Sequence, residues 1–200
     1  KILINGTTYT PYGATECLPI SNISGTEVLN ETALMSSDGL GTCVGNPLEN
    51  VNIKIIKEID GLIEDIHSII ELPTGSVGEI IVNSPSVTPE YFLMPAKTRE
   101  AKIYDGDNIW HRMGDVGYLD DRNRLWFCGR KTHVVTIQNI SHYSIPIEAI
   151  FNKHPEVKRS ALVKIENGEK RAGIVIERQD GKTNLSSEYK NRFFSELIDL

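Results

Sequence analysis

Asp115 and Arg130 are two charged residues whose spacing suggests a binding site for a polar ligand. Asp115 opens an alternating run of apolar and polar residues, Arg130 closes an apolar run, and the polar segment 120–123 separates them. This pattern predicts two strands joined by a tight turn, with the carboxylate and the guanidinium at the ends of neighbouring strands. Such a pair suits a polyhydroxylated ligand such as a ribose. A hairpin that carries only a surface ion pair would show the same pattern, because short motif matches are common.

A second stretch, Tyr12-Gly13-Ala14-Thr15-Glu16, lies far upstream of this hairpin. Together the two stretches resemble the signature of the adenylate-forming superfamily, which includes acyl-CoA synthetases, fatty acyl-AMP ligases, peptide-synthetase adenylation domains and luciferase. Further segments resemble motifs of that family in the same order: Gly41 to Pro47, Gly78 to Pro85, Tyr91-Phe92 and Gly129-Arg130. Ordered matches over most of the chain are more specific than any single one, so the chain is identified as a member of this superfamily.

The resemblance assigns roles to the upstream stretch. It implies that Tyr12 lies against adenine, that Thr15 contacts the α-phosphate and that Glu16 helps to hold magnesium. Thr15 and Glu16 are thus the expected catalytic residues, and Glu16 is the expected metal ligand. The chemistry fits, because a ring face suits a base and a hard carboxylate suits a hard cation. Gly13 can adopt backbone conformations closed to other residues, which lets the chain turn sharply beside the nucleotide. The alternative is a polar loop with a helix cap at Thr15.

For the hairpin, the resemblance implies that Asp115 holds the ribose hydroxyls of ATP and that Arg130 assists. The expected reaction is the Mg²⁺- and ATP-dependent activation of a fatty or β-hydroxy fatty acid as an acyl adenylate, with release of pyrophosphate. Members of the family carry a Ser/Thr/Gly-rich phosphate loop upstream and a catalytic lysine near the C-terminus, and neither occurs in this sequence. We therefore expect a C-terminal fragment whose partner is the remainder of its own chain. By itself it would be an inactive nucleotide-binding or scaffold piece.

Two departures from the family pattern bear on the second half of the reaction. Relatives usually carry a charged residue at the hinge position, where this chain has Thr132. Thioester-forming relatives usually carry a lysine and a glycine in the segment that here reads Gln138 to Ser144, without glycine. A missing glycine would obstruct a pantetheine arm, so the use of CoA is left uncertain. The runs 126–131 and 143–152 look most like olefin-pathway β-lactone synthetases, in which the substrate's own hydroxyl displaces AMP. An ordinary fatty acyl-CoA ligase is the alternative.

Composition limits the other function classes. The chain has 21 lysine and arginine residues against 27 acidic ones and a net charge of -6, which argues against a nucleic-acid partner. It has no apolar run long enough to cross a bilayer and no signal-peptide pattern, so we expect a cytoplasmic protein without a transmembrane segment. Its three cysteines, Cys17, Cys43 and Cys128, are far apart and suggest neither disulfides nor a zinc site. The lone His111 is expected to be structural.

These features predict an α+β fold with two parts. Residues 1–129 would form the β-rich, barrel-like end of the large adenylation domain, and residues 130–200 would begin a small α+β C-terminal domain beyond a hinge. Hydrophobic periodicity and turn residues predict strands, helices and irregular segments. The expected strands are 1–4, 51–55, 79–82, 115–119, 125–128, 134–137, 157–165 and 172–177; the expected helices are 96–101, 146–153 and 186–200; the expected irregular segments are 7–21 and 61–75.

Overall fold

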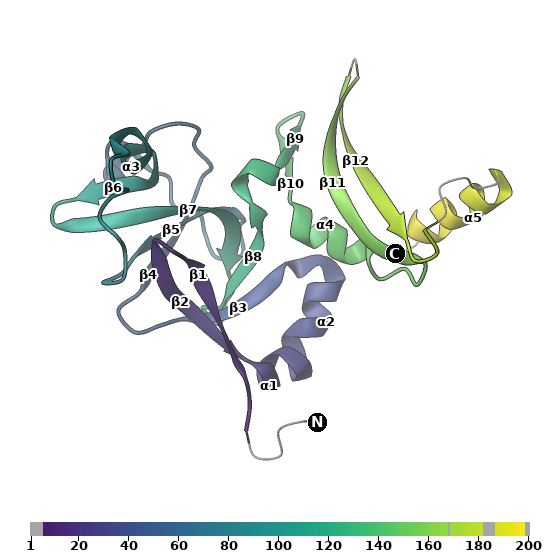
Figure 1. The fold of residues 1–200 in the computed structure, drawn as a ribbon, viewed down its shortest axis with the longest axis horizontal. Coiled ribbons are helices and arrows are strands. Elements are labelled where there is room, and N and C mark those ends of the chain that lie inside the picture. The colour runs from purple at the N-terminus through teal and green to yellow at the C-terminus, as the bar shows by residue number, and fades with distance from the viewer. Residues whose placement is uncertain (1–5, 168, 182–186, 199–200) are drawn as a thin grey trace.

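The first part of the chain folds around one large antiparallel sheet, seen at the left of Figure 1. The computed structural model describes residues 6–167, 169–181 and 187–198, so the strand expected at 1–4 lies outside the described residues. The sheet has eight strands in the order β1-β2-β3-β8-β7-β5-β4, and β6 pairs with β7 beside this path. The strands are β1 (Tyr9–Ala14), β2 (Cys17–Ser24), β3 (Thr42–Pro47), β4 (Asn52–Ile56), β5 (Gly78–Asn83), β6 (Lys102–Asp105), β7 (Asn108–Leu119) and β8 (Leu125–Arg130).

Both faces of this sheet carry apolar side chains, because successive residues of a strand point to opposite faces. Ile55 and Ile80 belong to one core cluster, whereas Ile56 and Ile81 belong to another. The irregular excursion expected at 61–75 is confirmed apart from one short 3₁₀ turn, Ile66–Ser68, and Ile63, Ile66 and Ile69 join the second cluster. Among the described residues the end strands β1 and β4 do not pair, so the sheet is open. The expectation of a barrel-like domain is corrected to this open sheet.

Residues 25–40 form a helical segment that the sequence pattern did not predict. It contains α1 (Gly25–Glu27) and α2 (Ala33–Met35), joined and followed by wider helical turns. The Ser24 hydroxyl caps its start by accepting a hydrogen bond from the Glu27 backbone N–H at 3.1 Å. A serine followed three residues later by glutamate is a known helix-start signal. The β-rich part expected at 1–129 therefore also contains a helical segment that was not predicted.

The helix expected at 96–101 is confirmed as α3 (Pro95–Ala101), with proline at its first turn as the sequence predicted. Among the helices of the described residues, none has both the length and the apolar composition that a bilayer crossing requires.

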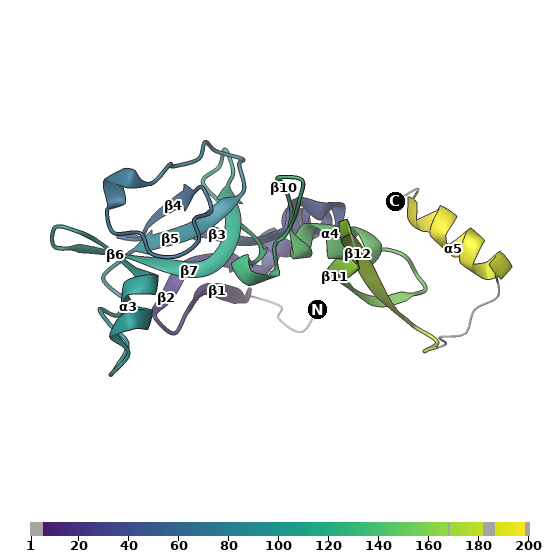
Figure 2. The ribbon, with the colours of Figure 1, turned by 90° about the horizontal axis from the view of Figure 1, so that it is seen from above.

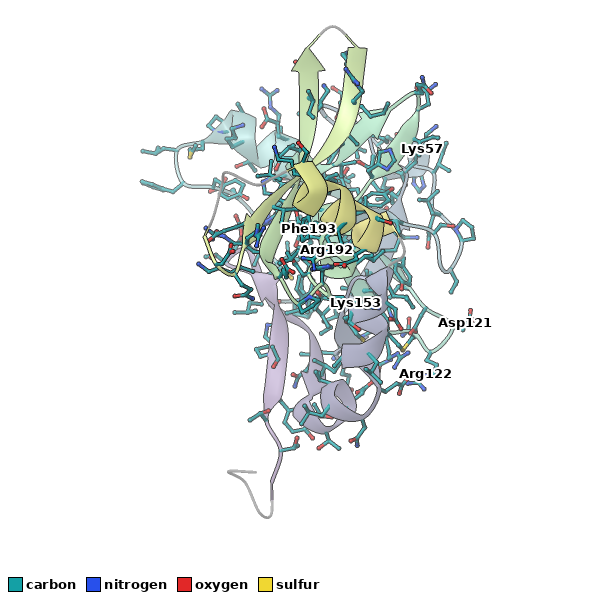
Figure 3. The ribbon with its side chains drawn as sticks, turned by 90° about the vertical axis from the view of Figure 1, so that its right-hand side faces the viewer. Lys57, Asp121, Arg122, Lys153, Arg192 and Phe193 are labelled. Carbon is teal, nitrogen blue, oxygen red and sulfur yellow. The ribbon has the colours of Figure 1, made fainter. Side chains whose placement is uncertain are left out.

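The second part of the chain has the helix, strand, strand, helix order that the sequence predicted (Figure 2). A small hairpin precedes these four elements. The two middle strands pair as a long twisted hairpin, which Figure 3 shows rising above the last helix. Phe193 on that helix packs with Val157, and Lys153 pairs with Asp38 of the first part. The α+β class is thus confirmed. The elements are β9 (Val135–Ile137), β10 (Ile140–His142), α4 (Ser144–Phe151), β11 (Val157–Asn167), β12 (Glu169–Arg178) and α5 (Ser187–Ile198).

The junction between the two parts follows directly on β8. Gly129 has a φ of 132°, and a Cβ there would lie 2.5 Å from the Ser144 hydroxyl, so this position needs glycine. Lys131 donates a hydrogen bond to Glu79 of the large sheet at 2.7 Å. A cation thus links the junction to the sheet, but it lies at position 131. The next position, where relatives usually carry a charged residue, is Thr132. The domain boundary at 129/130 and the hinge stay predictions.

Candidate functional site

The stretch from Tyr12 to Glu16 forms a tight hairpin. β1 pairs with β2 in a register that sets Tyr12 opposite Ser21 and Ala14 opposite Cys17, leaving a two-residue turn at Thr15 and Glu16. The expectation of an irregular segment at 7–21 was therefore wrong, because most of these residues pair as the strands β1 and β2. A Cβ on Gly13 would lie 2.5 Å from the backbone oxygen of Cys17. Glycine is needed here for space between the strands, not for the special backbone conformation that we expected, because Gly13 lies within β1 and its φ is not positive.

Asp115 lies at an irregularity of β7 that turns its side chain toward this hairpin. Opposite Ile80 alone on β5, strand β7 carries the three residues Met113, Gly114 and Asp115. Gly114 has a φ of 68°, which favours glycine. Such bulges bend a strand and re-aim side chains. The prediction that Asp115 and Arg130 lie on neighbouring strands is confirmed, since they are register partners of β7 and β8.

Three side chains from these strands form one hydrogen-bonded group. Arg130 Nη1 donates to Asp115 Oδ1 at 2.9 Å, and the Tyr12 hydroxyl donates to Asp115 Oδ2 at 2.6 Å. Asp115 is 5% exposed, whereas the Arg130 side chain is 57% exposed. Each oxygen of Asp115 has one partner, and a carboxylate can accept about four hydrogen bonds. Asp115 therefore keeps capacity for further donors such as hydroxyl groups.

Burial sets the electrostatics of this group. It raises the pKa of the Asp115 carboxyl above its ordinary value, even though the Tyr12 hydrogen bond and the Arg130 charge act in the opposite direction. Burial, together with the charge of Asp115, also raises the pKa of the Tyr12 hydroxyl far above its ordinary value. Tyr12 therefore stays protonated and remains a donor to Asp115.

Glu16 is placed to act as an ionised carboxylate. The Tyr91 hydroxyl donates to Glu16 Oε1 at 2.7 Å, and this bond is the main reason why the pKa of Glu16 is lowered. The charge of Lys102 lowers it further. Across the described ranges, no three His, Cys, Asp or Glu side chains gather as a ready-made metal cage. A single carboxylate fits magnesium nonetheless, since proteins often hold Mg²⁺ through one or two carboxylates plus substrate phosphates and water.

A cavity of about 560 Å³ joins the two stretches. Gly13, Thr15 and Glu16 line it from the hairpin turn, and Gly114 and Arg130 line it from β7 and β8. Tyr12 and Asp115 do not line this cavity, but Arg130, which donates a hydrogen bond to Asp115, does. The structure thus brings all six expected site residues together, four of them around one cavity. Their individual roles stay predictions.

Sequence reasoning gave no part in binding or catalysis to three further residues beside this cavity. Tyr91 and His111 line it, and Lys102 lies behind Tyr91 with its Nζ 5.9 Å from the ring centre. The Ala101 carbonyl accepts a hydrogen bond of 3.2 Å from His111 Nδ1, and burial lowers the pKa of His111 to about 4. His111 is therefore neutral near pH 7, in keeping with the structural role expected. Tyr91 belongs to the segment Tyr91-Phe92, which resembles a family motif, and this resemblance was the signal in the sequence that could have pointed to it.

Comparisons with known proteins identify relatives of this chain. No protein-family model matches the chain. The chain is 43% identical over 179 residues to the olefin beta-lactone synthetase of Xanthomonas campestris pv. campestris, covering 86% of this chain and 32% of that protein. It is 31% identical over 141 residues to the 2-succinylbenzoate–CoA ligase of Bacillus cereus, covering 69% of this chain and 26% of that one. The chain thus spans a third or less of the length of these relatives.

Solved structures show the same fold. The amide bond synthetase of Marinactinospora thermotolerans matches with a TM-score of 0.70 and 25% identity, over 94% of this chain and 35% of that one. The O-succinylbenzoate coenzyme A synthetase of Bacillus subtilis, in complex with ATP and a magnesium ion, matches with a TM-score of 0.68 and 23% identity, over 95% of this chain and 35% of that one. These matches lie in the C-terminal part of such enzymes.

Proposed function

Because this chain belongs to the superfamily of adenylate-forming enzymes, we propose that the whole protein uses ATP to activate a fatty or β-hydroxy fatty acid as an acyl adenylate. The observation that carries the proposal is the group formed by Tyr12, Asp115 and Arg130, next to a cavity lined by Thr15 and Glu16. It offers acceptors for ribose hydroxyls, a cation and a hydroxyl for phosphate, and a carboxylate for a metal ion.

Each residue would act through the contacts described above. Asp115 would accept hydrogen bonds from the ribose hydroxyls, held in place by Tyr12 and by the exposed Arg130. The exposed hydroxyl of Thr15 would donate to the α-phosphate, and Glu16 would bind magnesium. Magnesium, when bound, would neutralise phosphate charge as the acyl adenylate forms. The residues of this chain would thus orient the nucleotide and the metal.

The proposal is tested on the full-length protein with the variant Asp115→Ala. Hydrogen bonds to a charged group contribute about 1.5–3 kcal/mol each, so the kcat/KM for ATP in a pyrophosphate-release assay should fall by at least about tenfold. Asp107→Ala is a matched control, because Asp107 is an exposed aspartate in the turn before β7. Normal pyrophosphate release by Asp115→Ala, with an unchanged KM for ATP, would overturn the assignment.

For the second half-reaction we propose intramolecular attack by a β-hydroxyl group of the substrate, which forms a β-lactone and releases AMP. The higher identity to an olefin beta-lactone synthetase, 43% against 31% for a CoA ligase, supports this branch. The segment Gln138 to Ser144 forms a hairpin turn, β10 and the first residue of α4. Gln138 and Asn139 both have positive φ, at 49° and 65°, so the turn is built without glycine. By the family resemblance, side chains would therefore stand where a pantetheine arm passes in thioester-forming relatives.

The acceptor is identified from the products. Full-length protein with ATP and a β-hydroxy fatty acid should release AMP without CoA, and mass spectrometry should detect the lactone. With a plain fatty acid, no acyl-CoA should form. Formation of an acyl-CoA that depends on added CoA would favour the alternative, a fatty acyl-CoA ligase.

A further inference from the structure

The loop between β5 and α3 is fastened to the turn that carries the expected metal ligand. The Thr88 backbone N–H donates to the Glu16 carbonyl at 2.8 Å, and the Tyr91 hydroxyl donates to Glu16 Oε1 at 2.7 Å. Beside them, the Cys17 sulfur lies 3.4 Å from the Ser86 hydroxyl. Glu16 is therefore held by its backbone and by its side chain from one segment that is remote in sequence.

Tyr91 is itself fixed from behind. Its backbone N–H donates to the Thr98 hydroxyl at 3.0 Å, and that hydroxyl donates to the Met94 carbonyl at 3.1 Å. The Lys102 ammonium lies 5.9 Å from the centre of the Tyr91 ring, within the range of a cation–π contact. Thr98 and Lys102 are 7% and 2% exposed. Buried groups thus hold Tyr91 on two sides: Thr98 of α3 binds its backbone, and Lys102 of β6 lies against its ring.

We propose that Tyr91 is a positioning residue that holds the Glu16 carboxylate in the orientation that binds the metal ion. The inference rests on the proposed function, in which Glu16 binds magnesium beside ATP. The Tyr91 hydroxyl uses one carboxylate oxygen, and a carboxylate has acceptor capacity left for a cation. Without the hydroxyl, the partly exposed Glu16 side chain would sample other rotamers and would have to be ordered again on each binding event. Hydrogen-bond partners that orient a metal ligand typically change metal affinity or activity by 10–100-fold.

A purely structural role for Tyr91 makes a different prediction. If the hydroxyl only tethers the loop, its loss should lower the unfolding temperature and leave metal binding unchanged. Tyr91→Phe separates the two roles, because it keeps the ring and its contact with Lys102 and removes only the hydroxyl. Tyr104→Phe is a matched control, since Tyr104 is 51% exposed on β6.

The test uses the full-length protein with a non-hydrolysable ATP analogue and Mn²⁺ as the probe for the magnesium site. Free Mn²⁺ is counted by electron paramagnetic resonance, so the readout does not depend on turnover. Tyr91→Phe should raise the Kd for Mn²⁺ by about tenfold, whereas Tyr104→Phe should leave it unchanged. In a Glu16→Gln background the Tyr91→Phe change should have no further effect, because the carboxylate it positions is gone.

The outcomes distinguish a failure of the positioning role of Tyr91 from a failure of the proposed function, in which Glu16 binds the metal ion. If Glu16→Gln weakens Mn²⁺ binding and Tyr91→Phe does not, the positioning role is overturned and the proposed function stands. If Glu16→Gln also has no effect, both the metal role of Glu16 and the inference fail. If Tyr91→Phe does not fold, Thr98→Val is a second variant, because it removes the hydroxyl that accepts the hydrogen bond from the Tyr91 backbone N–H. It should weaken Mn²⁺ binding in the same direction, and unchanged binding would count against the inference.

Discussion

The buried carboxylate of Glu79 on β5 forms ion pairs with Arg112 of the sheet and Lys131 of the junction, and the contribution of these pairs to the free energy of unfolding can be measured. Glu79 is 1% exposed and accepts from Arg112 at 2.7 Å to Oε1 and 2.9 Å to Oε2. Lys131, the first residue after β8, donates to Oε2 at 2.7 Å. The Arg112 and Lys131 side chains are 8% and 17% exposed. One carboxylate thus balances two largely buried cations.

Replacing Glu79 with glutamine keeps the shape of the side chain and removes its charge. Removing one partner of a buried ion pair typically costs about 3–5 kcal/mol, because the remaining charge stays buried without compensation. We expect a loss near the lower end, about 3 kcal/mol. Arg112 keeps a hydrogen bond of 2.7 Å to a backbone carbonyl, and Lys131 lies near the carboxylate of Glu58.

Urea unfolding of the chain, followed by circular dichroism, measures this loss. Glu71→Gln is the matched control, because it removes the partner of Lys54 in an exposed pair whose side chains are 53% and 32% exposed. An exposed pair of this kind contributes about 0–1 kcal/mol. A loss for Glu79→Gln no larger than that for Glu71→Gln would refute the reasoning.

The pH dependence gives the same test a second readout. Burial alone would raise the pKa of Glu79, but the hydrogen bonds from Arg112 and Lys131 hold it below its ordinary value of 4.5. Below that value the unfolded chain binds more protons than the folded chain, so the contribution of Glu79 is present at neutral pH and lost on acidification. The stability difference between wild type and Glu79→Gln should therefore narrow below pH 4.5. A difference independent of pH would contradict the assignment of the effect to charge.

Three further predictions concern the stability of the fold. Burial lowers the pKa of His111 from 6.5 to about 4, so between these pH values the unfolded chain binds a proton at this histidine that the folded chain does not bind. The free energy of unfolding should therefore fall by up to about 3 kcal/mol as the pH is lowered from 6.5 to 4. His111→Asn should remove much of this fall in urea titrations. Gly13→Ala should cost about 1–3 kcal/mol in thermal unfolding, because its Cβ would meet the Cys17 carbonyl oxygen at 2.5 Å; an unchanged Tm would show that the hairpin relaxes. Trp126→Phe should cost about 1.5–3 kcal/mol more than Trp110→Phe, because the Trp126 indole N–H donates a hydrogen bond to the Asp120 carboxylate at 2.9 Å, whereas the Trp110 indole N–H has no hydrogen-bond partner among the described residues. Equal losses of stability would contradict this reasoning.

The sequence by itself determined the elements whose signals are local. The alternating run after Asp115, the polar turn at 120–123 and the apolar run before Arg130 predicted a hairpin, and β7 and β8 pair as expected. Turn chemistry and strand periodicity act over a few residues, so they can be read without the rest of the chain. The helical segment at 25–40 also had a local signal, the serine and glutamate at its start, which was overlooked.

Tertiary structure alone decided whatever depends on residues far apart in the sequence. The stretch 7–21 looked irregular, but pairing across the hairpin and with β3 orders most of it as strand. Whether the sheet closes depends on its end strands, which no local pattern describes.

The candidate site follows the same division. Residue types and family motifs pointed to Tyr12, Glu16 and Asp115, but their partners are set by the fold. Tyr12 reaches Asp115 across 103 positions of the sequence, and Tyr91 reaches Glu16 across 75. Hydrogen bonds between such distant residues depend on the register of several strands at once, because a shift of one residue turns a side chain to the opposite face. Sequence pattern therefore named the chemical groups, and the packing of the sheet decided which of them touch.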